Sequence, residues 1–236
     1  RAGRGTYTRV TRKGQNCRMP KKLNLKPGFF YTLGEEIANA ITHGVGSALA
    51  VAGTVILIVN AVGDPWKVVS ASIYGFSMIL LFTMSCLYHA ITNQRAKRII
   101  RVFDHTSIFV LIAGTYTPFT LVPLRGWVGW TIFGIVWGAA VFGIVLNIIS
   151  IERFKKVSMV CYIASGWCVV IAFVPLLQKL ALPGMLLLIL GGLVYTGGIL
   201  FYRRKGVRAM HALWHGFVLA GALLHYFDIL FYVTRA

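Results

Sequence analysis

Acidic residues are scarce in this chain, which has 6 Asp and Glu against 24 Lys and Arg in 236 residues. Charged residues of both signs amount to 13%, whereas a soluble domain carries about a quarter. Hydrophobic residues amount to 57%, and the mean hydropathy is +0.73. Because the apolar residues fall in runs that are too many and too long for one water-soluble core, this composition excludes a soluble globular domain and a disordered chain.

Cysteine is rare as well. The four cysteines, Cys17, Cys86, Cys161 and Cys168, form no CxxC pair, and the last three lie inside apolar runs. This arrangement argues against a disulfide framework and against a thiolate metal site. We expect cysteines in the apolar runs to pack as small hydrophobic side chains.

The net charge of +18 does not indicate a nucleic-acid partner. A nucleic-acid-binding domain carries its basic residues on a folded surface, whereas here they stand between hydrophobic runs. We therefore expect no nucleic acid as a partner. The basic segments are instead predicted to contact the anionic headgroups of the inner leaflet.

Long apolar segments dominate the rest of the chain. A helix needs about 20 mostly apolar residues to span the hydrocarbon core, and backbone groups in lipid must be bonded internally, which favours helices for segments of this length. The sequence therefore predicts an all-α membrane protein with seven transmembrane helices. The segments run approximately over 37–61, 67–91, 102–122, 127–149, 157–177, 183–202 and 210–233.

Two regions are predicted from the distribution of charge. Residues 1–34 contain nine Lys and Arg and no acidic residue. We expect this basic cytoplasmic tail to be disordered or to lie on lipid headgroups, and, since the chain starts at Arg1 rather than Met, we treat part of it as an artefact of where the sequence starts. Residues 35–236 are predicted to form the seven-helix transmembrane domain.

The orientation of the helices follows from the positive charges between them. The tail and the connections after the second, fourth and sixth segments hold 20 Lys and Arg, and the alternate connections and the C-terminus hold 4. Cytoplasmic loops carry the positive excess. The N-terminus is therefore predicted to be cytoplasmic and the C-terminus to be outside.

Small residues recur at helical spacing in two of the segments. Such residues let helix backbones approach closely in a membrane, where no hydrophobic force drives helices together. We interpret them as packing positions rather than as a ligand site: Gly44, Ala48 and Ala52 in the first segment, and Gly191, Gly192, Gly197 and Gly198 in the sixth.

Ionisable residues within spanning helices cost about 2.5–3.5 kcal/mol each on insertion scales, so each needs a partner or a function. With the predicted orientation, His89 lies near the inner end of the second segment, Asp104 near the inner start of the third, and His211 and His215 in the first turns of the seventh. These four side chains from three helices are predicted to meet at one level in the cytoplasmic half of the bilayer.

Their spacing suggests a zinc site. His211 and His215 stand at i and i+4, so both imidazoles lie on one helix face. Together with His89 they leave a fourth position for water, as in a catalytic zinc site. Asp104 is then placed to hold that water and take its proton, and Ser85 to orient a ligand or donate to a developing oxyanion. The alternative is that the histidines only hydrogen-bond between helices.

The other histidines are assigned with less specific roles. His105 is predicted to be structural, and His43 either joins the cluster or caps a neighbouring helix. His225 lies ten residues beyond His215, which is about 15 Å along a helix. That is too far to share an ion, so we expect a hydrogen bond within the bundle.

The remaining acidic residues are expected to be unremarkable. Glu35 and Glu36 stand at the start of the first segment, where negative charge interacts favourably with the helix dipole. Asp228 approaches the outer surface and is expected to be solvated.

Motifs on four of the segments resemble those of a known family. They are residues 35–44 (EEIANAITHG), 85–89 (SCLYH), 103–105 with 113–118 (FDH and AGTYTP) and 211–215 (HALWH). They closely resemble bacterial haemolysin III proteins, which are related to the adiponectin and progestin receptors and, more distantly, to alkaline ceramidases. The resemblance extends over approximately residues 35–233.

The resemblance implies a seven-helix bundle in the cell membrane of a bacterium, with Zn²⁺ near the cytoplasmic face. Carried over to this chain, the ligands would be His89, His211 and His215, with Asp104 on the zinc-bound water and Ser85 supporting it. Three functions stay open. They are a zinc-dependent hydrolase of lipid-like amides or a membrane-lipid homeostasis factor, with a lipid held in a cavity between the helices; a cytolysin; and a non-enzymatic zinc-containing sensor or regulator.

Overall fold

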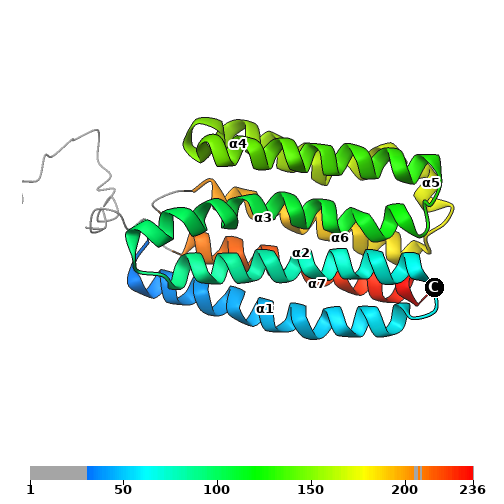
Figure 1. Ribbon diagram of the computed structural model, residues 1–236, viewed down its shortest axis with the longest axis horizontal. Coiled ribbons are helices and arrows are strands. Elements are labelled where there is room, and N and C mark those ends of the chain that lie inside the picture. Colours follow the sequence, from blue (N-terminus) through cyan, green and yellow to red (C-terminus); the bar gives the residue numbers. More distant parts are fainter. Residues whose placement is uncertain (1–30, 205–206, 208, 236) are drawn as a thin grey trace, which may run out of the picture.

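Helices make up all the regular structure in the part of the chain that the computed structural model describes, residues 31–204, 207 and 209–235. They run roughly side by side along the long axis of the molecule (Figure 1). In chain order they are α1 (Leu33–Ala61), α2 (Pro65–Ala90), α3 (Gln94–Leu121), α4 (Trp127–Gly166), the 3-10 turn η1 (Cys168–Ala172), α5 (Phe173–Leu177), α6 (Leu182–Tyr202), α7 (Met210–Ile229) and the π turn η2 (Leu230–Thr234).

Side-chain caps fix where the first three helices begin. Thr32 and Glu35 form a capping box at α1, in which the Glu35 backbone N–H donates to the Thr32 hydroxyl and the Glu35 carboxylate accepts from the Thr32 backbone. Asp64 caps α2 just before Pro65, which suits a first helical position. Asn93 caps α3. The polar residues between the apolar runs therefore end one helix and start the next.

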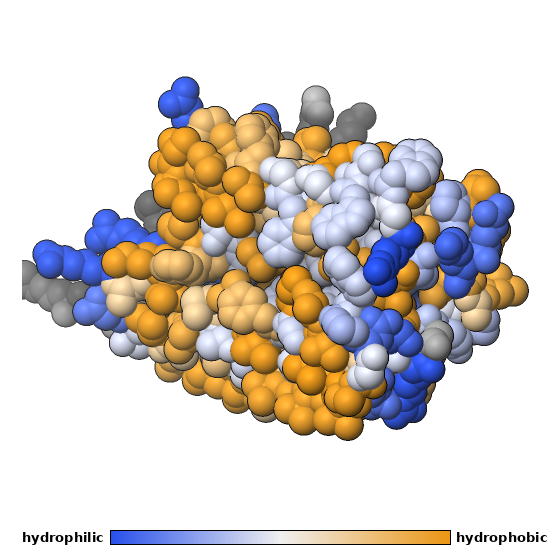
Figure 2. All heavy atoms as spheres, turned by 45° about the vertical axis from the view of Figure 1, so that its right-hand side comes forward, coloured by the Kyte–Doolittle hydropathy of each residue, from blue (hydrophilic) through white to orange (hydrophobic). Residues whose placement is uncertain are grey.

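The outer faces of the helices are apolar. Figure 2 shows hydrophobic residues over much of one face and strongly hydrophilic residues gathered mainly toward its two ends. Among the described residues, six helices are long and apolar enough to cross a membrane: Leu33–Ala61, Pro65–Ala90, Gln94–Leu121, Trp127–Leu177, Leu182–Tyr202 and Met210–Thr234. An all-α membrane fold is thus confirmed.

The count of helices differs from the seven that the sequence predicts. The predicted fourth and fifth segments, 127–149 and 157–177, belong to one stretch, Trp127–Leu177, so six such helices are found instead of seven. The reason is that no loop separates them: the chain is helical on both sides of Ser150, whose φ of −170° and ψ of 108° are the only non-helical values inside α4. Glu152 and Arg153, which were expected in a loop, lie in the helix.

The two halves of α4 nevertheless contact each other. The Ser158 hydroxyl donates to Oδ1 of Asn147 at 2.8 Å, and the Asn147 amide lies 3.3 Å from the Tyr162 hydroxyl. In a straight helix, residues 147 and 158 would be about 16 Å apart along the axis. The chain therefore folds back at Ser150, and the halves before and after it lie side by side.

The other helix boundaries differ from the predicted ones by a few residues, except in α3. Residues 94–101 were expected in a connection, yet α3 begins at Gln94 and includes Arg95, Lys97 and Arg98. Lys and Arg are good helix formers, and their long side chains can reach water from a helix end. Residues 1–30, which make up most of the predicted basic tail, and Cys17 lie outside the described residues, and Leu33 and Gly34 belong to α1.

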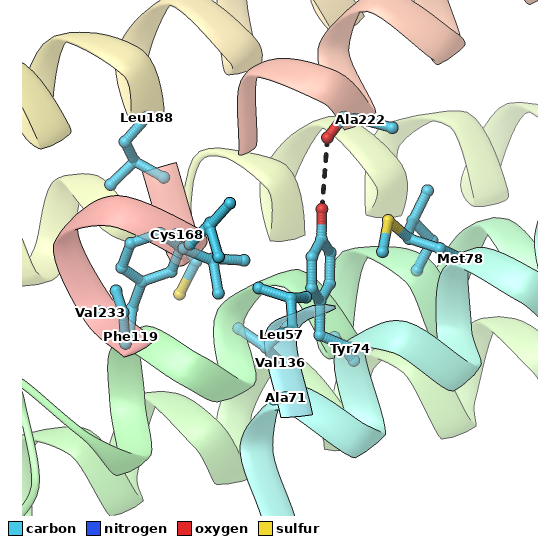
Figure 3. Close-up of a cluster of buried hydrophobic side chains, with 14 of the residues drawn as sticks. Leu57, Ala71, Tyr74, Met78, Phe119, Val136, Cys168, Leu188, Ala222 and Val233 are labelled. Carbon is cyan, nitrogen blue, oxygen red and sulfur yellow. Dashed lines mark hydrogen bonds between the residues drawn. The ribbon is translucent and has the colours of Figure 1, made fainter. Parts of the chain in front are cut away.

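One face of α1 is buried along its whole length. The buried positions recur every three or four residues and change from polar to apolar: Glu36, Asn39, His43, Gly46, Ala50, Gly53, Leu57 and Ala61. The apolar part meets α2 and α7 in a hydrophobic core, where the Tyr74 hydroxyl donates to the Ala222 carbonyl oxygen at 3.3 Å (Figure 3). Polar side chains thus gather at one end of the bundle, the end at which α1 begins and α2 ends.

The contact between α3 and α4 depends on the absence of a side chain at Gly143. A Cβ there would lie 2.0 Å from Cζ of the buried Phe109, whereas a Cβ at Gly138 in the same helix would meet nothing within 4 Å. We expect Gly143→Ala to be less stable than Gly138→Ala by about 1–3 kcal/mol, the usual cost of overpacking. Both variants gain the same helix propensity, so a comparison of thermal unfolding in detergent isolates the contact. Equal stability of the two variants would contradict it.

Candidate metal centre

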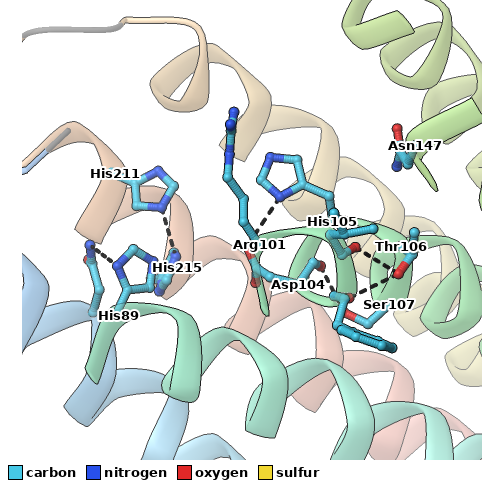
Figure 4. A network of polar contacts seen from close by, with 12 residues as sticks. His89, Arg101, Asp104, His105, Thr106, Ser107, Asn147, His211 and His215 are labelled. Carbon is cyan, nitrogen blue, oxygen red and sulfur yellow. Dashed lines mark hydrogen bonds and ion pairs between the residues drawn. The ribbon is translucent and has the colours of Figure 1, made fainter. Parts of the chain in front are cut away.

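Three histidines from two helices converge at the polar end of the bundle. His89 lies in the last turn of α2, and His211 and His215 lie in the first turns of α7. One ligand nitrogen from each lies within 4.8 Å of the others, and His89 and His215 are buried. The Nε2 atoms of His211 and His215 are 3.1 Å apart (Figure 4). The three imidazoles that the sequence placed at one depth are thus brought together, and they can hold a metal ion.

The donor chemistry fits an ion. His89 Nε2 is buried and has no hydrogen-bond partner among residues 31–204, 207 and 209–235, and Nε2 of His215 has the Nε2 of His211 beside it at 3.1 Å. A buried polar atom left unpaired costs about 1–3 kcal/mol. Neutral imidazoles that offer a lone pair to a shared ion remove that cost and match the preference of first-row divalent metals for nitrogen ligands.

Glu36 orients His89. Its Oε2 lies 2.5 Å from Nδ1 of His89, and its Oε1 accepts a hydrogen bond from Nζ of Lys97 at 2.9 Å. Both Glu36 and Lys97 are buried, each with 5% of its surface exposed. A carboxylate on one ring nitrogen fixes the tautomer and the direction of the other, so Glu36 leaves Nε2 of His89 as the lone pair available for an ion.

The structure corrects the role predicted for Glu36. The sequence indicated only a favourable interaction with the helix dipole, but Glu36 is an internal ion-pair partner, and its neighbour Glu35 is the residue that closes the capping box. A signal was present in the sequence: Glu36, Asn39 and His43 stand at i, i+3 and i+7, on a single helix face. Three polar residues on one face of an otherwise apolar helix indicate a polar interior.

His43 lies beside the three converging histidines but does not belong to the group that can hold the ion. Its ring stacks on that of His215, with centroids 3.8 Å apart and planes at 13°. Neither of its nitrogens has a hydrogen-bond partner among the described residues. His43 therefore supports the position of His215 by stacking, and the group whose ligand atoms converge consists of His89, His211 and His215.

Asp104 and Ser85 face the same cavity as the histidines. The cavity has a volume of about 160 Å³, and its lining includes Ser85, Asp104, His211 and His215. The Asp104 carboxylate lies 3.4 Å from Nδ1 of His105. The two residues predicted to act beside the metal thus line the same cavity as two of the three histidines.

His105 links two helices. Its backbone carbonyl oxygen accepts a hydrogen bond from the Tyr162 hydroxyl at 2.8 Å, which joins α3 to α4. Its ring lies next to Asp104 (Figure 4), and His105 lines the same cavity as His211 and His215.

Tyr31 covers the histidine cluster, which the sequence did not indicate. Its ring stacks on His211 with centroids 4.5 Å apart and lies 5.7 Å from the ring of His89. Burial raises the pKa of the Tyr31 hydroxyl, so the hydroxyl stays protonated. The segment just before α1 therefore packs on the histidines with an aromatic ring.

One basic and one acidic residue of α7, His225 and Asp228, lie toward the opposite end of the bundle. Nε2 of His225 lies 3.2 Å from the Leu188 carbonyl oxygen, which confirms the predicted hydrogen bond within the bundle. The prediction that Asp228 is solvated is wrong: it is fully buried, and neither carboxylate oxygen has a hydrogen-bond partner among the described residues. Its carboxylate lies against α6, where a Cβ at Gly184 would be 3.0 Å from Oδ1 of Asp228.

The fold and the site define a class, an all-helical membrane protein with a buried histidine cluster that can hold a metal ion. Within that class, the chain belongs to the family described as Haemolysin-III related, which matches residues 31–226. The resemblance seen in the motifs is thereby confirmed. With its six apolar helices, the protein is a multi-pass protein of the cell membrane.

Individual relatives span nearly the whole chain. The Hemolysin-3 homolog of Bacillus subtilis (strain 168) is 46% identical over 207 residues, which are 87% of this chain and 97% of the relative. Hemolysin-3 of Bacillus cereus is 44% identical over 201 residues, or 84% and 92%. The human monocyte to macrophage differentiation factor is 27% identical over 231 residues, or 94% and 92%.

The role of Glu36 can be tested through metal affinity. We expect Glu36→Gln to weaken the binding of a divalent transition metal by about 10–100-fold, because the amide no longer fixes the orientation of His89. Metal affinity is measured by chelator competition on purified protein, with His211→Ala as the baseline without a complete cluster. The matched control is Glu35→Gln, which should keep wild-type affinity. Equal losses in the two glutamine variants would show that Glu36 has no special role.

Proposed function

We propose that this protein is a zinc-dependent hydrolase of amide bonds in lipid-like substrates. The observation that supports this function best is the cluster of His89, His211 and His215 beside Asp104 at one end of an apolar cavity. Zinc is favoured because neutral imidazoles suit it and because three protein ligands leave one position open, as in catalytic zinc sites.

The side chains around the cluster take distinct roles in this proposal. His89, His211 and His215 hold the ion, and Glu36 keeps His89 in position. Bound there, zinc would polarise the substrate carbonyl and supply hydroxide near neutral pH. The Asp104 carboxylate takes up the proton released from the attacking water, and the Ser85 hydroxyl donates to the oxygen on which negative charge develops.

The cavity supports a lipid as substrate. Its lining is mostly apolar and includes Leu81, Ile108, Ile112 and Ile163. An apolar lining binds an acyl chain and keeps bulk water away from the reacting carbonyl. In this view membrane lipids are both the surroundings and the source of substrate, and the Lys and Arg residues at the polar end contact anionic headgroups.

We further propose seven membrane crossings, with the N-terminus cytoplasmic and the C-terminus outside. The return of the chain at Ser150 supports one crossing for each half of Trp127–Leu177. The division of basic residues, 20 against 4, supports the orientation. The histidine cluster would then lie toward the cytoplasmic face.

The topology can be tested by labelling single cysteines in a background without the native ones. A cysteine at Glu152 should react with an impermeant thiol reagent only after the cytoplasmic side is exposed, whereas one at Lys179 should react from outside. Labelling of both from the same side, or protection of Glu152→Cys from both sides, would contradict seven crossings. The measurement is the labelled fraction on intact cells and on inverted vesicles.

Activity can be tested on N-acyl amides of the ceramide type, with purified protein in lipid nanodiscs. We expect Asp104→Asn to lower the rate by about 10²–10⁴-fold, the usual contribution of a general base, without changing the metal content. Asp64→Asn is the matched control and should keep most of the activity, because Asp64 caps the start of α2 outside the cavity and asparagine caps a helix as well as aspartate does. Full activity in Asp104→Asn, or in protein freed of metal, would refute the hydrolase.

A cytolysin is the second candidate, because the two Bacillus relatives carry the name Hemolysin-3. Dye release from liposomes distinguishes the two functions. A cytolysin releases dye in proportion to the added protein and regardless of Asp104→Asn. A zinc-containing sensor would bind metal and lipid and show neither release nor turnover.

A further inference from the structure

A second pair of polar rings lies between α6 and α7, outside the histidine cluster. His225 of α7 and Tyr195 of α6 face each other with ring centroids 5.5 Å apart and planes at 67°. His225 is 93% buried, and its Nδ1 has no hydrogen-bond partner among the described residues. The Tyr195 hydroxyl is also buried and has no such partner there.

Two glycines make room for these rings in a reciprocal way. A Cβ at Gly191 of α6 would lie 2.1 Å from the His225 ring, and a Cβ at Gly221 of α7 would lie 2.9 Å from the Tyr195 ring. The ring on each helix therefore packs against a glycine of the other helix. The glycines that the sequence indicated as packing positions include one that seats a polar ring rather than an apolar one.

The hydrogen-bonding capacities of the pair are complementary. Nε2 of His225 faces the Leu188 carbonyl oxygen at 3.2 Å and so carries the proton as donor, which leaves Nδ1 as an acceptor. The Tyr195 hydroxyl can donate. A buried polar group without a hydrogen-bond partner costs about 1–3 kcal/mol of stability. The presence of two such groups side by side, on His225 and Tyr195, therefore needs an explanation. The two rings face each other at a centroid distance of 5.5 Å, and a hydroxyl group has the capacity to donate to one of these atoms and accept from the other.

Both rings line the cavity that also contains His211 and His215. The ten residues from His215 to His225 correspond to about 15 Å along α7. The cavity thus has polar groups near both ends and a mostly apolar lining, which also includes Thr115 and Thr196. A ligand that satisfies both ends carries a head group and, about 15 Å away along an apolar chain, a hydroxyl group.

We propose that His225 and Tyr195 form a specificity site that selects lipids with a hydroxylated acyl chain. The head group of such a lipid lies at the histidine cluster, and this part rests on the function proposed above. The chain hydroxyl donates to Nδ1 of His225 and accepts from the Tyr195 hydroxyl. An unmodified acyl chain leaves both protein groups unpaired and binds less tightly.

The probes are lauric acid and ω-hydroxylauric acid, and the protein is the full chain with its metal in lipid nanodiscs. Binding is followed by the intrinsic fluorescence of Trp167 and Trp214, which line the cavity. We expect wild type to bind the hydroxy acid about three- to tenfold more tightly, as one or two net hydrogen bonds allow. Tyr195→Phe should bring the ratio of affinities close to one while lauric acid binds as before.

The control is Tyr226→Phe. Its hydroxyl lies 3.3 Å from the Gly53 carbonyl oxygen and outside the cavity, so this variant should keep the wild-type ratio. A ratio near one in wild type, a ratio unchanged in Tyr195→Phe, or no binding of either acid overturns the specificity site.

His215→Ala separates the two proposals. If it weakens the binding of both acids equally, the head group lies at the cluster; if it leaves both affinities unchanged with the preference intact, the head group is not held at the cluster and the specificity site stands without it.

Discussion

The buried contact between Glu36 and His89 is the interaction on which the polar end of the bundle depends. Glu36 comes from α1 and His89 from α2, and Lys97 of α3 completes the ion pair. His89 in turn lies against His211 and His215 of α7. Ionisable groups in a membrane interior are expensive unless paired, so each of these side chains requires the others. The same constraint that holds four helices together therefore also assembles the group that can bind a metal.

Away from this end, the helices are held together by close packing of side chains rather than by ion pairs. In a membrane, apolar side chains gain little by leaving lipid for a neighbouring helix, so close contact between helices comes from small residues and complementary shapes. Gly46 lies against Phe82, Gly53 against Tyr226 and Gly143 against Phe109. The polar rings of Tyr195 and His225 are fitted by the same device. Glycine thus shapes the cavity wall as well as the contacts between helices.

Most of the fold could be predicted because the membrane restricts it severely. Backbone groups in lipid must bond internally, so each long apolar run had to be helical, and the caps at Asp64 and Asn93 mark helix starts in the sequence itself. The return at Ser150 is different. Glu152 and Arg153 indicated a loop, but good helix formers follow Ser150, and a single extended residue turns the chain. The sequence predicts that the chain breaks there but cannot show how sharply.

The sequence by itself determined which residues could form the metal centre, because the depth of His89, His211 and His215 follows from their distance to the helix ends. It did not determine which way Glu36 points, that His43 stacks on His215 rather than joining the three, or that Asp228 is buried. Those outcomes depend on the rotation of each helix about its axis and on its neighbours. Helical periodicity shows which residues share a face, and only the packing of helices distant in the chain decides what that face meets.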